Sequence, residues 1–165
     1  SLMFLLTCVL LIKSCFDKDL FFSNMSFDNK DEVINFLCEK LKGRTEVPDN
    51  FKSLVFERES LSATDIGNGV AIPHPTRYLL NENIVAICHL DEPLEWGTSK
   101  VNFVFLLGLS KEFNEVSEIL QQTLLNIFND ISSLVELLEN PTFETFIKLI
   151  NTNSKNISDR KDIFI

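Results

Sequence analysis

Residues 101–107 read VNFVFLL, and nearly every one of them is apolar. A strand with one face in water alternates apolar and polar residues, so this continuous apolar run predicts a strand covered on both faces. Residues 84–90 (IVAICHL) form a second run that is rich in β-branched residues and is bounded by turn-forming residues. The two runs predict neighbouring strands of a central sheet.

Helical patterns precede these strands. Residues 28–42 repeat apolar side chains at helical spacing, with Asp28 as the expected N-cap and Gly43 just past the end. A second helix is predicted to begin near Pro48 and to carry Arg58 in its last turn.

Helical patterns also follow the strands, at residues 112–129 and 131–139, and Asn140 with Pro141 is expected to open a last helix that ends at Ile150. Strands with helices on both sides in the sequence predict an α/β fold, a single domain in which a mixed β-sheet is flanked by helices on both faces.

The two ends of the chain differ from its centre. Residues 1–19 are predicted to be an apolar N-terminal segment that packs on the domain or links it to a preceding one, and the chain is interpreted as a fragment of a longer protein. The apolar run at 2–12 is too short to span a bilayer and lacks a basic n-region, so no membrane insertion is expected. The domain is assigned to residues 20–150, and the polar tail at 151–165 is expected to be mobile.

The charge and the cysteines limit the function classes. The formal charge of −9 makes a broad nucleic-acid or anionic-membrane surface improbable. The cysteines form no CxxC pair and no regular framework, which favours free thiols and a cytoplasmic location. The four are Cys8, Cys15, Cys38 and Cys88.

The stretch GNGVAIPHP at residues 67–75 places His74 between two prolines. Pro73 fixes its own φ, and Pro75 keeps the preceding residue out of the α region, so His74 is held extended. The two glycines upstream permit a turn with positive φ, and the apolar residues after them predict a short strand. The sequence therefore predicts a histidine fixed at the end of a strand.

An imidazole near pH 7 can act as a base, a metal ligand or a nucleophile toward phosphorus. A metal site is disfavoured because the other histidine, His89, directly follows Cys88 in a strand whose neighbours point to opposite faces. The chain lacks a G-x-S-x-G nucleophile elbow, a Walker loop and a GxGxxG motif, so hydrolase and nucleotide sites are unsupported and no cofactor or metal is expected. His89 is interpreted as structural.

Two interpretations of His74 remain: it belongs to a phosphoryl site, or it is a surface or core residue with no chemical role. Arg58 and Arg77 are close enough in sequence to meet His74 in space, and a guanidinium can hold phosphoryl oxygens with two hydrogen bonds. Phosphoryl transfer to an imidazole depends mainly on positioning and charge stabilisation.

Residues 57–75 (ERESLSATDIGNGVAIPHP) closely resemble the active-site signature of fructose- and mannitol-type IIA domains of the bacterial sugar phosphotransferase system. The resemblance extends over roughly residues 21–150. It implies that His74 accepts a phosphoryl group from the phosphocarrier HPr, that Arg58 stabilises that group, and that a cysteine of a IIB domain can receive it. The supporting loop consists of Gly67, Asn68, Gly69, Pro73 and Pro75.

Two departures from the transport members of this family matter. Transport members often carry a second active-site histidine, and residues 111–122 contain none, which argues against efficient onward transfer of the phosphoryl group. Residues 20–27 and 94–110 resemble the version at the C-terminus of transcriptional antiterminators and activators. The leading hypothesis is thus a phosphoacceptor domain of a sugar-responsive regulator, which binds nucleic acid only through other domains and is a phosphoryl carrier rather than a turnover enzyme. The alternatives are a IIA phosphocarrier of sugar uptake and a degenerate interaction module that is not phosphorylated.

Overall fold

The computed structural model describes residues 2–112 and 115–161. The two predicted strands lie at its centre, as β4 (Ile84–Glu95) and β5 (Lys100–Gly108), and they pair in an antiparallel hairpin. Residues 84–90 are all buried, as their apolar run predicts.

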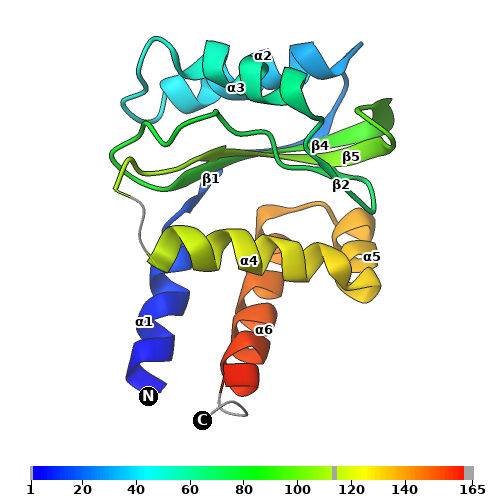
Figure 1. The fold of residues 1–165 in the computed structure, drawn as a ribbon. Coiled ribbons are helices and arrows are strands. Elements are labelled where there is room, and N and C mark those ends of the chain that lie inside the picture. Colours follow the sequence, from blue (N-terminus) through cyan, green and yellow to red (C-terminus); the bar gives the residue numbers. More distant parts are fainter. Residues whose placement is uncertain (1, 113–114, 162–165) are drawn as a thin grey trace. The chain divides into compact units, whose positions relative to one another are not determined.

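Three further strands complete a five-stranded sheet in the order β1-β4-β5-β3-β2 (Figure 1). β1 (Phe16–Met25) is parallel to β4, and β3 (Val70–Ala71) is parallel to β5. β2 (Asp65–Gly67) is antiparallel to β3. The sheet is therefore mixed, which confirms the predicted α/β class. The strand β3 ends just before the His74 loop.

The strand β1 was not predicted, and it begins inside the segment assigned to the N-terminus. Its sequence, FDKDLFFSNM, buries only Phe16 and Leu20 fully. As an edge strand with shifts in its register against β4, it lacks the regular alternation on which a sequence prediction depends. One irregularity is Asn24, which has a positive φ of 55°.

The first predicted helix is α2 (Lys30–Lys42), and its N-cap is Asn29 rather than Asp28. The Asn29 side chain accepts a hydrogen bond from Glu32 N at 3.0 Å, while Glu32 Oε2 accepts from Asp28 N at 2.9 Å. This reciprocal arrangement satisfies two backbone donors, so Asp28 occupies the position before the cap. Gly43 is the C-cap, as expected.

The second predicted helix is α3 (Phe51–Leu61), which carries Arg58 in its last turn. Figure 1 shows α2 and α3 together over one face of the sheet, and α2 contacts both β4 and β5. Fully burying one Leu or Phe side chain contributes roughly 1.5–3 kcal/mol, so this layer is a major source of stability. The buried side chains of its core include Val33, Ile34, Leu37, Leu41, Phe51, Val55, Ala86, Cys88, Val104 and Leu106.

The described parts of residues 1–15 and 114–165 form a second compact unit, separate by contacts from residues 16–113. It contains α1 (Leu2–Lys13), α4 (Glu115–Asn129), α5 (Ile131–Glu139) and α6 (Phe143–Lys161). Within it, α4 contacts each of the other three helices, and α1 contacts α6. None of the helices in the described residues is long and apolar enough to cross a membrane.

Two expectations for the last helix are wrong. The backbone N–H of Asn140 bonds to Glu136 O and so ends α5, whereas Thr142 Oγ1 accepts from Thr145 N at 3.2 Å and caps α6. The helix does not stop at Ile150 but continues through most of the tail that was expected to be mobile. Polarity alone misled the prediction, because a polar segment can still extend an existing helix once its first turns are formed.

Candidate functional site

The turn that precedes the His74 loop joins β2 to β3 through Asn68 and Gly69. Their φ values of 55° and 79° are those of a type I′ hairpin turn, for which Asn-Gly is the preferred pair. A Cβ on Gly69 would lie 2.9 Å from Asn102 Oδ1, and the Gly69 carbonyl accepts from Asn102 N at 2.7 Å. The predicted glycine turn is thus observed, and close contact with β5 adds a second reason for glycine.

The loop itself is tied to its neighbours on both sides of His74. Before it, the Pro73 carbonyl accepts a hydrogen bond from Leu107 N of β5 at 2.9 Å. After it, Thr76 N donates to the Leu54 carbonyl of α3 at 3.3 Å. Pro73 and Pro75 are buried while His74 is half-buried, so the loop holds the imidazole at a fixed place with partial access to solvent.

The His74 ring has a defined orientation. Its Nδ1 lies 2.8 Å from the carbonyl oxygen of Ile72. A carbonyl oxygen can only accept, so Nδ1 carries a proton in this arrangement, and in the neutral ring Nε2 keeps its lone pair. Nε2 is therefore the nitrogen that can act as a nucleophile.

Arg58 lies on α3 one turn after Leu54, the residue to which the His74 loop is bonded. The loop is therefore bonded to α3 at a backbone carbonyl four residues before Arg58. Its Nη1 donates to the Ser62 carbonyl at 2.7 Å, and no hydrogen bond joins it to His74 among the described residues. Arg77 is exposed. Both arginines thus keep donors for a further acceptor.

A buried carboxylate lies beside Arg58. Glu59 is 6% exposed, and its two oxygens accept from Thr64 N at 3.0 Å and from Thr64 Oγ1 at 2.6 Å. Lys30 Nζ is 3.8 Å from Glu59 Oε1. Glu59 was not predicted as a site residue, although it stands in the motif of residues 57–75; the sequence signal for it is an acidic residue beside the motif arginine at a helix end.

The described residues contain no group of three or more side chains arranged to hold a metal. His89 lies in β4, 8% exposed, and its Nδ1 accepts a hydrogen bond from Asn24 N of β1 at 3.1 Å. The ring also packs on Phe103, with centroids 4.9 Å apart. His89 thus fills a structural place in the sheet.

This hydrogen bond predicts a pH dependence of stability. Burial lowers the pKa of His89 below its ordinary 6.5, while the charge of Asp91 acts in the opposite direction. Because the unfolded chain protonates first, the free energy of unfolding should fall as the pH drops below about 6.5, by about 1 kcal/mol for the loss of the Asn24 bond. Urea unfolding between pH 8 and 5 measures this, with His89→Gln as the variant that lacks the titration. Equal pH profiles for the two chains would contradict the assignment.

None of the four cysteines forms a disulfide, as predicted. Burial raises the pKa of Cys38 and of Cys88 to about 12 each. Neither can supply a thiolate near neutral pH.

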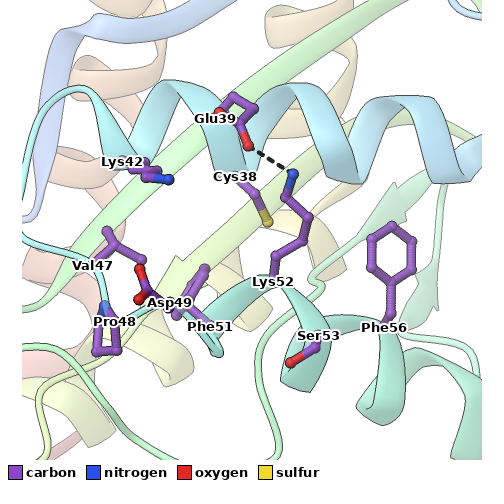
Figure 2. Close-up of a pocket in the computed structure, with 10 residues that line it drawn as sticks. All are labelled: Cys38, Glu39, Lys42, Val47, Pro48, Asp49, Phe51, Lys52, Ser53 and Phe56. Atoms are coloured by element: carbon purple, nitrogen blue, oxygen red, sulfur yellow. Dashed lines mark hydrogen bonds and ion pairs between the residues drawn. The ribbon is translucent and has the colours of Figure 1, made fainter.

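A pocket of about 620 Å³ opens between α2 and α3. Figure 2 shows the Lys52 side chain reaching across it to Glu39, with Nζ and Oε1 2.6 Å apart. No residue predicted for the phosphoryl site lines it. Its walls are formed by Cys38, Glu39, Lys42, Val47, Pro48, Asp49, Phe51, Lys52, Ser53 and Phe56.

Comparison with known proteins identifies the relatives of this chain. Residues 14–153 match the family described as "Phosphoenolpyruvate-dependent sugar phosphotransferase system, EIIA 2". The "Probable licABCH operon regulator" of Bacillus subtilis is 33% identical over 74% of the chain and 19% of its own length. "Transcriptional regulator ManR" of the same organism is 32% identical over 71% of the chain and 17% of its own length. The chain therefore spans less than a fifth of either regulator.

The fold has solved counterparts. The Escherichia coli mannitol enzyme IIA, in its complex with phosphorylated enzyme IIB, matches with a TM-score of 0.70. The match covers 83% of this chain and 99% of that one, at 21% sequence identity. The fold expected from the resemblance is therefore confirmed.

Proposed function

Because the chain belongs to the EIIA 2 family of the phosphoenolpyruvate-dependent sugar phosphotransferase system, we propose that it accepts a phosphoryl group on Nε2 of His74. The observation that carries the proposal is the hydrogen bond from Nδ1 to the Ile72 carbonyl. In the neutral ring this bond leaves Nε2 unprotonated, in a loop tied to β5 and α3 on either side of the ring.

In the proposed step the Nε2 lone pair attacks phosphorus. A bond forms between Nε2 and phosphorus while the bond from phosphorus to the donor atom of HPr breaks, and that atom keeps the bonding electrons. The proton on Nδ1 stays in place, so positive charge develops on the ring and the Ile72 carbonyl stabilises it. Arg58 is proposed to hold the phosphoryl oxygens.

We place this domain in a sugar-responsive transcriptional regulator of the antiterminator or activator type. The names of the two Bacillus subtilis relatives support this placement. The net charge of −9 is consistent with nucleic-acid binding by other parts of such a protein. A phosphoryl group adds close to two negative charges at a fixed point, which can alter contacts with adjacent domains, and the expected compartment is the cytoplasm.

HPr is the proposed donor, and a IIB domain is a candidate acceptor because the solved mannitol IIA is in complex with phosphorylated IIB. The test is incubation of the chain with phosphoenolpyruvate, enzyme I and HPr, followed by intact mass. We expect one acid-labile phosphoryl group that appears only with HPr present.

Two other results would redirect the proposal. An unmodified chain, under conditions in which the same HPr phosphorylates an established IIA domain, would favour the interaction module that is not phosphorylated. Rapid onward transfer from the phosphorylated chain to a IIB cysteine would favour a role in sugar uptake. A regulator should instead hold its phosphoryl group for longer.

A further inference from the structure

A chain of hydrogen bonds leads from a buried carboxylate at the end of α3 to the His74 ring. Glu59 accepts from both the backbone N–H and the hydroxyl of Thr64, at 3.0 and 2.6 Å. The Thr64 carbonyl accepts from Ile72 N at 3.1 Å. The Ile72 carbonyl in turn receives the Nδ1 proton of His74 at 2.8 Å. In this series of hydrogen bonds, each residue is thus held by the one before it.

Because the Glu59 carboxylate is buried, this series of hydrogen bonds is expected to stay intact. An isolated carboxylate buried at 6% exposure would be strongly unfavourable, so its partners must remain in place. Lys30 of α2 supplies the opposite charge at 3.8 Å, and the same ammonium group donates to the Trp96 carbonyl at 3.1 Å. Glu59 thereby connects α3, α2 and the β4–β5 hairpin to Thr64.

Ile72 links this hydrogen-bonded framework to the ring of His74. Its N–H is held by Thr64, and its carbonyl selects which nitrogen of His74 is protonated. A shift of Thr64 would rotate or displace the Ile72 peptide group, and the bond that keeps Nε2 unprotonated would weaken. Small misplacements of a reacting group can reduce a rate roughly 100-fold.

We propose that Glu59 is a positioning residue for the phosphoacceptor: acting through Thr64 and Ile72, it holds the His74 ring in the Nδ1-protonated form. The consequence for rate rests on the proposed function of His74, whereas the consequence for the ring proton does not. The two can therefore be measured separately.

The first variant is Glu59→Gln. Its amide keeps the volume but has one acceptor oxygen in place of two, so it cannot accept from both Thr64 donors in the observed geometry. Nitrogen-15 NMR of the His74 ring, in the unphosphorylated full chain, reports the protonated nitrogen directly. We expect a lower fraction of Nδ1–H, and phosphorylation at saturating HPr about 10-fold slower.

A second pair of variants covers the case in which Glu59→Gln fails to fold. Thr64→Val removes only the hydroxyl donor and should shift the ring equilibrium in the same direction, whereas Thr64→Ser should restore the native spectrum and rate. The matched control is Glu39→Gln, which breaks another glutamate–lysine pair, on the outer side of α2. It should leave the His74 spectrum unchanged.

The outcomes separate the two proposals. A native ring spectrum and a native rate in folded Glu59→Gln or Thr64→Val would overturn the positioning role. If the variants shift the ring spectrum but HPr never phosphorylates even the native chain, the positioning role would be supported and the proposed function overturned. A loss of rate in proportion to lost stability, with no spectral change, would reduce Glu59 to a purely structural group.

Discussion

Replacing His74 with glutamine is expected to abolish HPr-dependent phosphorylation. The amide of glutamine has no nucleophilic lone pair on nitrogen, so no bond to phosphorus can replace the one that Nε2 is proposed to form. The loop should survive, because Pro73 and Thr76 are held through their backbone atoms. Intact mass after incubation with phosphoenolpyruvate, enzyme I and HPr should show no adduct, and the melting temperature should stay near that of the native chain.

The second histidine provides the control for this experiment. The chain contains two histidines, and His89 lies buried in β4 with its Nδ1 occupied by Asn24 N. Glutamine at position 89 should reduce stability by about 1 kcal/mol and leave the adduct intact. An adduct that survives in His74→Gln and disappears in folded His89→Gln would reverse the assignment of the two residues.

Much of the fold was predictable because the apolar patterns are strong. The run at residues 101–107 belongs to β5, where each of these residues is buried except the half-buried Asn102. Burial of this kind requires apolar side chains almost throughout, and this makes the strand recognisable in the sequence. Edge strand β1 carries no comparable pattern, since much of FDKDLFFSNM is exposed or half-buried. Two helix N-caps also escaped prediction, because local hydrogen-bond geometry places Asn29 and Thr142 in these positions instead of nearby candidates.

The candidate site was predictable to a different extent. The two prolines around His74 and the glycine turn before them restrict the backbone directly, so both could be predicted from the sequence. The proton on Nδ1 could not be predicted, because it depends on where the Ile72 carbonyl lies in space. Glu59 escaped for the same reason: its bonds to Thr64 form only after α3 ends and the chain turns back toward β2.

Arg58→Ala is expected to slow phosphorylation of His74 about 100-fold, comparable to the loss of one donor that stabilises transition-state charge. In the proposed role the guanidinium meets the phosphoryl oxygens as they leave HPr, so its removal should act on the rate at saturating HPr. The variant also loses the bond from Nη1 to the Ser62 carbonyl, which costs about 1 kcal/mol of stability. Reactions that are quenched at set times, at a temperature far below the melting temperature, and analysed by intact mass measure the rate without a contribution from unfolding.

Two further arginine variants separate a phosphoryl contact from a helix-end contact. Arg58→Lys keeps a positive charge and a donor for Ser62 but loses the planar fork, so it should recover stability and only part of the rate. Arg77→Ala removes an exposed arginine on the same loop, three residues after His74, and should change the rate by less than the Arg58 variants. A native rate in Arg58→Ala would remove this residue from the site, and a large loss in Arg77→Ala alone would transfer the oxygen contact to Arg77.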